Sequence, residues 1–290
     1  MSSAWSWFVI LGTVLSLVAT LAFLLANRST SGQETTGHDY DGIQELDNPL
    51  PLWWVGMFIV SILFAGGYLI YYPGLGNFSG IGNWSSADQV AREQQAHEDR
   101  FAPLYARLAQ LDEAGLHADR QAQQVGRRLF INNCSTCHGV TGQGAFGFPN
   151  LTDDEWIWGK GFDKVKTALQ NGRQAAMPGW AAALGDQGVD DVTQHVLKLA
   201  GSEHNPEAAA RGAGQYAMFC VACHGPEGSG NPILGAPNLT NDIWLYGGNA
   251  DAIAFTLRHG RNGNMPSFAR VLDPDRIHIL AGYVTSLSRQ

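Results

Sequence analysis

Two uncharged, strongly apolar segments lie near the start of the chain. The first runs from Trp5 to Ala26, 22 positions without a charged residue, and the second runs from Leu50 to Tyr72. About 20 apolar residues suffice for a helix to cross a bilayer, and aromatic residues, such as those at both ends of the second segment, favour its interfaces. The pattern predicts two transmembrane helices. The alternatives are a secretory signal peptide for the first segment and a buried core helix for the second.

A polar sequence with a helical period follows the second apolar segment. Pro73 ends the helix because it has no amide hydrogen to donate, and a glycine-rich stretch comes after it. From Ser86 to about Ala122, apolar residues recur at the spacing of one helix face. Residues 81–122 are therefore predicted to contain a connector helix between the membrane and the rest of the protein.

The remainder of the chain is a tandem repeat. Cys-x-x-Cys-His occurs at 134–138 and again at 220–224, an offset of 86 that becomes 88 after a loop differing by two residues. Further matches extend through both repeats: Pro149–Thr152 with Pro237–Thr240, Trp156 with Trp244, Gly172 with Gly260, and Leu199 with Leu287. Helical patterns precede each motif and close each repeat. Residues 123–202 and 203–290 are predicted to form two similar globular domains rather than a solenoid, which needs at least three units.

Charge and cysteine content narrow the function classes. The formal net charge is -8 at pH 7, but residues 27–51 hold one arginine against five carboxylates, whereas both repeats are close to neutral. No basic surface is indicated, so nucleic-acid binding is not supported, and a partner of the repeats would dock on local patches. All four cysteines lie in the two motifs, which leaves none for a structural disulfide.

Cys-x-x-Cys-His is the attachment signature of c-type haem. Two thiols add to the vinyl groups of the haem, and the adjacent histidine supplies an axial nitrogen to the iron. The sequence therefore predicts two covalently bound haems c. Their predicted attachment and axial residues are Cys134, Cys137 and His138 in the first repeat and Cys220, Cys223 and His224 in the second. The alternatives, a zinc site or a thioredoxin-like redox site, fit poorly because paired zinc ligands normally lie within about 15–20 residues.

Methionines at matching positions are the predicted sixth ligands of iron. Met177 and Met265 each precede a proline in a glycine-rich stretch, 39 and 41 residues after His138 and His224. A thioether is a weak, soft ligand that favours ferrous iron and raises the reduction potential. Ligation by two histidines has less support, since no other histidine repeats. Spacing leaves open whether each methionine serves the haem of its own repeat or of the other one.

Two further residue pairs repeat. Arg173 and Arg261 are candidates for charge-assisted hydrogen bonds to haem propionates, with a solvated loop cation as the alternative. Trp156 and Trp244 are expected to be core aromatic residues against the haem edge.

The order of helix, Cys-x-x-Cys-His, methionine loop and closing helix resembles the class I cytochrome c fold. An all-α protein is expected, with two transmembrane helices followed by tandem cytochrome c-like domains. Because bacteria attach haem to cysteines on the periplasmic side, both haem domains are expected in the periplasm and residues 27–51 in the cytoplasm. The predicted segments are 1–36 with the first membrane helix, 37–80 with a family motif and the second helix, the connector 81–122, and the haem domains 123–202 and 203–290.

Residues 37–54, GHDYDGIQELDNPLPLWW, together with YYPGLGNFSG at 71–80, carry a more specific resemblance. This stretch before a tandem di-haem head resembles the di-haem c-type subunit (subunit III) of cbb3-type cytochrome c oxidases, over about 37–290. Members typically have one anchoring helix, so the first helix is a departure. The resemblance implies a bacterial inner-membrane complex with a haem-copper catalytic subunit and a mono-haem c subunit, and oxygen reduction coupled to proton pumping.

The function expected from this resemblance is electron relay. Electrons would enter from a soluble cytochrome c or similar donor, pass the two haems and leave for the catalytic subunit, and the chain itself would make no bonds on a substrate. A tethered di-haem shuttle for another reductase or dehydrogenase is one alternative. A di-haem peroxidase is another, but it would need one iron with an open coordination position.

Overall fold

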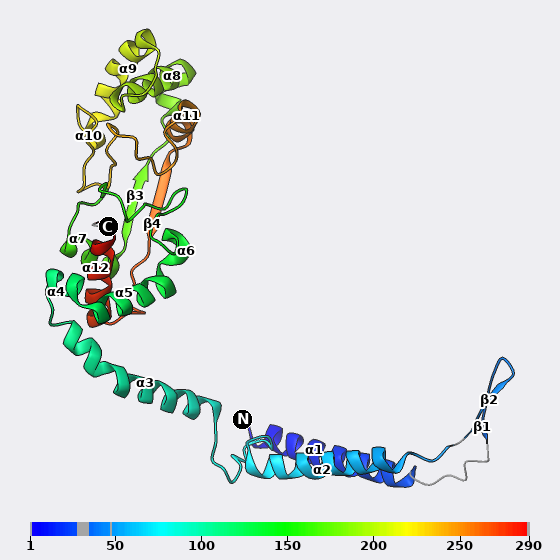
Figure 1. Cartoon of the computed structure of the whole chain (residues 1–290). Helices are drawn as coiled ribbons and strands as arrows, with labels where there is room; N and C mark the ends of the chain where they lie inside the picture. Colours follow the sequence, from blue (N-terminus) through cyan, green and yellow to red (C-terminus); the bar gives the residue numbers. More distant parts are fainter. Residues whose placement is uncertain (1, 28–34, 47, 289–290) are drawn as a thin grey trace. The chain divides into compact units, whose positions relative to one another are not determined.

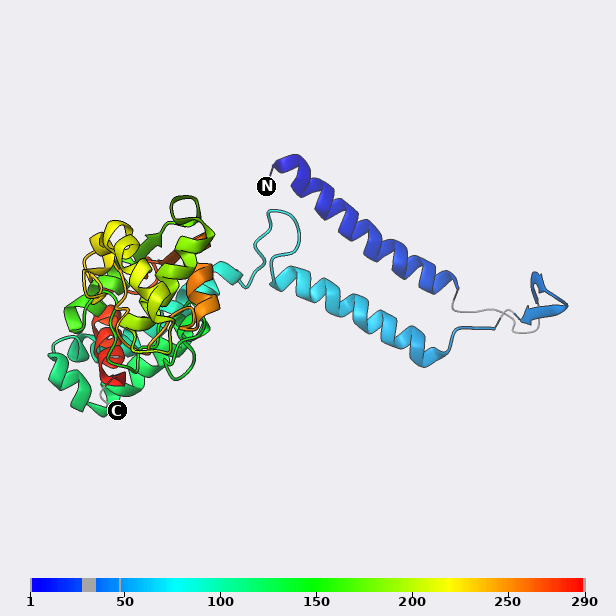
Figure 2. The same ribbon diagram turned by 90° about the horizontal axis from the view of Figure 1, so that it is seen from above.

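The computed structural model describes residues 2–27, 35–46 and 48–288, and the chain divides into two compact units, residues 1–100 and 101–290. In the first unit, α1 (Ser3–Ala26) and α2 (Leu52–Tyr71) are both long and apolar enough to cross a membrane. They run antiparallel to each other (Figure 2). The Ser6 hydroxyl near the start of α1 accepts a hydrogen bond at 2.8 Å from the amide of Asn77, which follows α2. This contact ties the start of α1 to the end of α2.

A small hairpin lies between the two apolar helices. Strands β1 (Thr35–Tyr40) and β2 (Ile43–Leu46) pair antiparallel, and Asp41 and Gly42 join them with φ of 55° and 89°. Two successive residues with positive φ are what a two-residue hairpin turn requires, and Asp-Gly is a favoured sequence for it. The protein is thus mainly helical, as predicted, but it has a short two-stranded sheet in its acidic segment.

The predicted connector is broken into two helices. The first, α3 (Ser86–Leu108), carries the chain from one unit into the other, and α4 (Glu113–Ala118) follows after a short turn. Asp112 caps α4 by accepting the amide hydrogen of Gly115 at 2.8 Å. Leu108 and Leu116 are fully buried against Ile279, so the end of the connector belongs to the core of the second unit.

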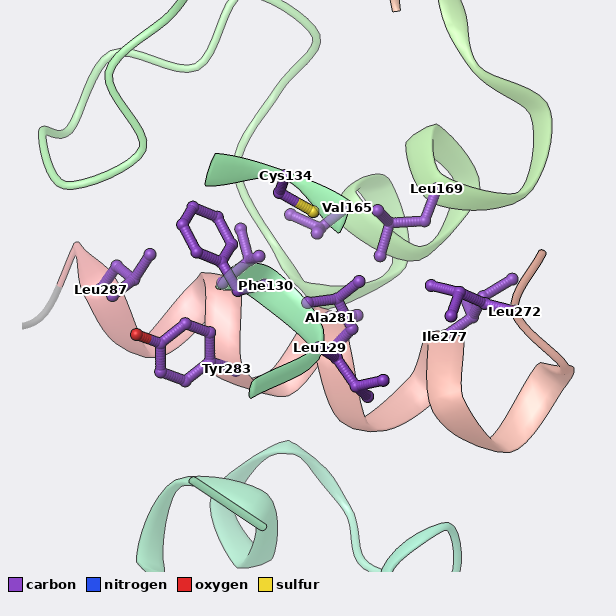
Figure 3. Close-up of a cluster of buried hydrophobic side chains, with 12 residues drawn as sticks. Leu129, Phe130, Cys134, Val165, Leu169, Leu272, Ile277, Ala281, Tyr283 and Leu287 are labelled. Carbon is purple, nitrogen blue, oxygen red and sulfur yellow. The ribbon is translucent and has the colours of Figure 1, made fainter. Parts of the chain in front are cut away.

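The second unit has two lobes, which differ in composition from the sequence repeats predicted at 123–202 and 203–290. The helices of the first lobe, besides α4, are α5 (Arg120–Asn133), α6 (Ser135–His138), α7 (Phe162–Asn171) and α12 (Pro274–Leu287). The core of this lobe joins side chains of α5, α7 and α12, among them Phe130, Leu169 and Tyr283 (Figure 3). The closing helix of the second repeat therefore packs on the motif-bearing helix of the first.

The second lobe is assembled in the same way from the middle of the chain. Its helices are α8 (Ala181–Leu199), α9 (Pro206–Phe219), α10 (Val221–His224) and α11 (Ala250–His259). Helix α8 closes the first repeat, yet it packs on α9 and α11 of the second repeat. The chain thus passes from the first lobe to the second between α7 and α8, and it returns to the first lobe between α11 and α12.

A two-stranded ribbon makes both crossings. Strands β3 (Arg173–Met177) and β4 (Arg261–Met265) pair antiparallel over their full length, with Arg173 opposite Met265 and Met177 opposite Arg261. Figure 1 shows α8, α9 and α11 at one end of this ribbon and α5, α7 and α12 at the other. The helices predicted around each motif are confirmed, whereas this cross-repeat sheet was not predicted.

Glycines allow the close helix contact within each lobe. A Cβ at Gly126 of α5 would lie 2.4 Å from the Cβ of Tyr283 in α12, and one at Gly212 of α9 would lie 2.1 Å from the carbonyl oxygen of Asp191 in α8. Real side chains do not approach this closely, so the two helix pairs require glycine at these positions. The same requirement in both lobes shows that each cross-repeat pair is closely packed.

We predict that Gly212→Ala destabilises the protein by about 1–3 kcal/mol, because the added methyl group must push α9 away from α8. Gly214→Ala on the same helix is the matched control, since nothing lies within 4 Å of a Cβ there. The control should be stabilised slightly, by up to about 1 kcal/mol, because alanine favours the helix. Thermal or denaturant unfolding of the two variants measures the difference. Equal stabilities would contradict the close α8–α9 contact.

Candidate functional site

Each Cys-x-x-Cys-His motif forms one helical turn at the end of a longer helix. Helix α5 ends at Asn133 with Cys134 as its C-cap, and α6 then places His138 at its last residue. In the second lobe, Cys220 and His224 take the same places after α9. In both motifs the first cysteine and the histidine are buried, the second cysteine is exposed, and all four thiols are free. The structure therefore brings the predicted attachment residues of each motif together in a like arrangement.

One hydrogen bond fixes the orientation of each motif histidine. The Nδ1 atoms of His138 and His224 lie 3.0 Å from the carbonyl oxygens of Pro149 and Pro237 respectively. A carbonyl can only accept, so Nδ1 carries the proton and donates it, which leaves the lone pair of Nε2 free. Metal-bound histidines commonly have this arrangement, in which the second nitrogen donates to a carbonyl. Nε2 of each ring is therefore available to bind a metal ion.

Burial disfavours the charged forms of the histidine and the first cysteine in each motif. It lowers the pKa of His138 and of His224, against the opposing effect of the hydrogen bonds to the proline carbonyls. It also raises the pKa of the Cys134 thiol to about 12 and that of Cys220 to about 11. Zinc needs deprotonated thiolates, so buried neutral thiols do not suit it. Nowhere in the described ranges do three or more His, Cys, Asp or Glu residues gather as metal ligands.

The two predicted methionines lie in exchanged positions. Met265, in the second repeat, packs against the core of the first lobe, which contains Cys134. Met177, in the first repeat, packs against the core of the second lobe, which contains Cys220. Both methionines and both arginines are the inward-facing residues of their strands, and cross-strand pairing puts all four on one face of the ribbon. Each lobe therefore combines the Cys-x-x-Cys-His of one repeat with the methionine of the other.

Two glycines permit the crossing. Gly260 follows α11 with φ 73° and ψ -176°, a conformation open essentially to glycine alone, and its Cβ would lie 2.3 Å from the carbonyl oxygen of Met177. Gly172 follows α7 in the same conformation, and its Cβ would lie 2.5 Å from the carbonyl oxygen of Met265. The sequence showed these glycines as a repeated pair, and the structure gives the reason. Each lets the methionine of the other repeat come close to the end of a helix.

The repeated arginines differ in their surroundings. Arg261 lies over the rings of Tyr246 and Phe255, at 4.3 and 5.0 Å, and its Nε donates to the Thr256 hydroxyl at 2.9 Å. Arg173 lies 5.1 Å from the ring of Trp158, but its Nε is buried and has no hydrogen-bond partner among the residues described. The Nη2 of Arg173 donates to the Lys164 carbonyl oxygen at 3.2 Å. The two arginines therefore differ at Nε, which is paired in Arg261 and unpaired in Arg173.

Buried donors without partners mark where a further group fits. In the described part of the chain, the buried side-chain atoms without a partner include three that can only donate: Trp156 Nε1, Arg173 Nε and Asn241 Nδ2. The others are His195 Nδ1 and the acceptor Gln215 Oε1. Buried donors are almost always hydrogen-bonded, so these three suit acceptor oxygens that the chain does not supply. A haem carries two propionates, and its other needs are met by the thiols, the Nε2 atoms and the thioethers. The residues present therefore fit haem c. Trp156 and Trp244 also pack against the cores of the first and second lobes, as expected of core aromatic residues, whereas Asn241 carried no signal in the sequence.

Paired attachment motifs, buried histidines with a free Nε2 and helices of cytochrome c type define a tandem c-type cytochrome on a membrane anchor. Two family models match the chain: the N-terminal domain of cytochrome oxidase-cbb3, FixP, over residues 32–79, and cytochrome c oxidase, cbb3-type, subunit III, over 121–196 and 207–284. The chain belongs to the family of subunit III of cbb3-type cytochrome c oxidases. This confirms the resemblance seen at residues 37–54.

Named relatives agree with this family. The CcoP subunit of the cbb3-type oxidase of Rubrivivax gelatinosus is 43% identical over 99% of this chain and 96% of its own length. The FixP subunit of Bradyrhizobium sp. (strain ORS 278) is 40% identical over 89% of this chain and 96% of its own length. The CcoP subunit of Cereibacter sphaeroides is 37% identical over 87% and 94%. The first of these matches includes nearly all of α1.

We predict that Gly260→Ala lowers the free energy of unfolding more than Gly185→Ala does. Gly185 has nearly the same conformation, φ 65° and ψ 173°, but nothing within 4 Å of a Cβ, so it measures backbone strain alone. That strain costs about 1–3 kcal/mol at either position. The contact with Met177 should add about 1–3 kcal/mol at Gly260. Equal losses in denaturant unfolding would show that the Met177 strand does not lie against α11.

Proposed function

We propose that this membrane-anchored electron-transfer subunit of a cbb3-type oxidase binds two haems c and relays electrons through them. The proposed covalent attachment residues are Cys134 and Cys137 for one haem and Cys220 and Cys223 for the other. The matched environments of His138 and His224 carry the proposal, because both rings are buried, hydrogen-bonded at Nδ1 and free at Nε2. When bound, haem supplies a one-electron couple at its iron, and the chain supplies the ligands and the exclusion of water.

The proposed axial pairs are His138 with Met265 and His224 with Met177. The packing of each methionine against the core that contains the other repeat's first cysteine supports this exchanged assignment. Because both lobes provide a methionine, both irons would be six-coordinate. That favours electron transfer, which needs no open position, over peroxidase chemistry, which does.

Arg173 is the better supported propionate contact of the two repeated arginines. Its buried Nε has no partner among the described residues, whereas the Nε of Arg261 is engaged by Thr256. We propose that Arg173 and Trp156 Nε1 bind propionate oxygens in the first lobe. Arg261 would contribute to the second haem through its position opposite Met177 on the ribbon.

The proposed electron route starts at a soluble c-type cytochrome and ends at the haem-copper catalytic subunit, where oxygen is reduced to water. The mono-haem c subunit of the oxidase is a further proposed partner. In this role the chain makes no bonds on a substrate of its own. The family assignment favours an oxidase over a tethered shuttle for another reductase.

We propose that the haem lobes lie in the periplasm of a bacterial inner membrane. Because α1 and α2 are antiparallel, the N-terminus would then lie on the periplasmic side and the β1–β2 hairpin in the cytoplasm. Arg28, which agrees with this orientation on the positive-inside rule, lies outside the described residues.

The exchanged ligation can be tested in a chain with one haem. In a Cys134→Ser/Cys137→Ser variant, mass spectrometry should find one covalent haem instead of two, attached in the second lobe. Adding Met177→Ala should then abolish the near-infrared sulfur-to-iron charge-transfer band, because that sulfur is the proposed ligand of the remaining iron. Adding Met265→Ala instead is the matched control and should leave the band. Loss of the band in the Met265→Ala variant alone would refute the exchange.

If both irons are six-coordinate, they have no open position for an added ligand such as carbon monoxide. The reduced, freshly purified chain should bind carbon monoxide poorly and lack peroxidase turnover, yet it should accept electrons rapidly from a small reductant. Absorption spectroscopy under carbon monoxide measures this. Rapid, stoichiometric binding by the fully folded chain would show an open iron and favour an enzyme. Binding that appears only after detergent damage would reflect a detached methionine loop, so intact charge-transfer absorption is the control.

A further inference from the structure

Positions 153 and 241 are equivalent in the two repeats but differ in chemistry. Asp153 follows Pro149–Thr152 in the first repeat, and Asn241 follows Pro237–Thr240 in the second. In both, side-chain Oδ1 accepts the backbone N–H two residues later at 3.1 Å, from Glu155 and Ile243 respectively. Both side chains therefore make the same hydrogen bond within their own turn. One presents a carboxyl oxygen where the other presents an amide nitrogen.

The side-chain amide of Asn241 indicates what kind of group lies next to this position. Asn241 Nδ2 is buried and has no partner in the described chain, so it requires an acceptor from outside the chain. Haem is the group that the family brings to these lobes, and its propionates are such acceptors. At position 153 the equivalent atom is an oxygen. An ionised carboxylate would repel a propionate there, whereas a protonated carboxyl group can donate to it, as the asparagine does.

The surroundings of Asp153 make its ionised form less favourable than that of an exposed aspartate. Asp153 is half-buried and lines a groove of about 350 Å³ between the loops that contain Pro149 and Trp244. Burial raises its pKa, and the nearby carboxylates of Glu155 and Asp154 add to the rise, against the lowering effect of the hydrogen bond from the Glu155 amide.

The charged groups around Asp153 are few. On its own loop, Glu155 also lines the groove and accepts a hydrogen bond at 3.2 Å from Asn238 Nδ2. Asp154 is exposed and pairs with Lys160. From the opposite loop the groove is lined by residues that do not titrate: Pro237, Asn238, Ile243, Trp244, Leu245 and Gly247. The charge near Asp153 that changes in turnover would then be that of the haem.

We propose that Asp153 is a proton-binding group coupled to the redox state of the haem in the first lobe, an inference that rests on the proposed function. When a one-electron donor reduces ferric iron to ferrous iron, the Asp153 carboxylate takes up a proton from solvent and becomes a carboxylic acid. When the electron leaves for the acceptor, the proton returns to solvent. Asn241 cannot titrate, so the haem of the second lobe lacks this coupling.

The sign of the pH effect follows from charge. Ferric haem carries one more positive charge than ferrous haem, so oxidation stabilises the carboxylate and reduction stabilises the acid. The pKa of Asp153 is therefore lower in the oxidised than in the reduced protein. Between these two pKa values the midpoint potential falls as pH rises, and outside them it is constant. For one proton and one electron the slope cannot exceed about 59 mV per pH unit.

Spectroelectrochemical titration of the haem-loaded full chain at a series of pH values tests the proposal. In the unaltered chain, one of the two midpoint potentials should fall with pH and the other should not. Asp153→Asn should abolish the fall, and the fold should tolerate it because asparagine occupies position 241 in the same turn. Asp154→Asn is the matched control, since it removes an equal charge from an exposed side chain, and it should keep the slope. Asp153→Asn/Asn241→Asp should transfer the dependence to the other midpoint.

A second readout is infrared. Reduced-minus-oxidised difference spectra should contain a carbonyl stretch of a carboxylic acid that is lost in Asp153→Asn and kept in Asp154→Asn. An unchanged slope in Asp153→Asn, or its loss in Asp154→Asn, would overturn the inference. If all variants keep two covalent haems and the sulfur-to-iron band, such a result refutes the role of Asp153 alone. A missing haem or a missing band would instead refute the proposed function.

Discussion

The antiparallel pairing of β3 with β4 is the constraint on which the haem-binding unit depends. Five residues of each repeat pair along the whole ribbon, from Arg173 opposite Met265 to Met177 opposite Arg261. Antiparallel pairing makes the strands run in opposite directions, so each strand carries its methionine into the lobe that the other strand leaves. Helix α8 must then complete the second lobe and α12 the first. The two repeats consequently share their cores, and neither lobe is complete without both.

Much of the architecture could be predicted from the sequence because it is locally encoded. The apolar segments, the helices around each motif and the paired cysteines and histidines all lie where their residues indicate. The exchange of methionine strands and closing helices between the two repeats could not be predicted. The repeats have matching core residues, so packing α12 on α5 or α8 on α5 would bury similar side chains, and pattern alone cannot choose. Chain length offers a physical reason: the six residues 200–205 between α8 and α9 reach at most about 20 Å. Because α8 and α9 both lie in the second lobe, this short link does not have to span the two lobes.

Two other features illustrate the limits of sequence patterns. The β1–β2 hairpin had a readable signal, because Asp41-Gly42 is a favoured two-residue turn, yet no strand was predicted in this segment. Asn241 had no signal at all. Its side chain matters through a buried Nδ2 without a partner, and such an atom can be recognised only when the surrounding chain is in place.

The two lobes are nearly alike, and the small chemical differences between them matter for function. The histidines of both lobes have the same hydrogen bond, the same burial and the same free nitrogen, so their intrinsic ligand properties should be alike. Differences between the haems must then arise from the groups around them. Arg173 differs from Arg261 in its unpaired donor, and Asp153 differs from Asn241 in its charge. A relay with two inequivalent centres can give electrons a preferred direction, which two identical centres cannot do.

Each haem lobe combines residues of both repeats. A crystal structure of the haem-loaded chain, at a resolution that shows side chains, tests this arrangement. We expect the iron held by His138 to be bonded to the sulfur of Met265 and the iron held by His224 to be bonded to the sulfur of Met177. A structure in which each iron is bonded to the methionine of its own repeat, with α8 packed on α5, would contradict it.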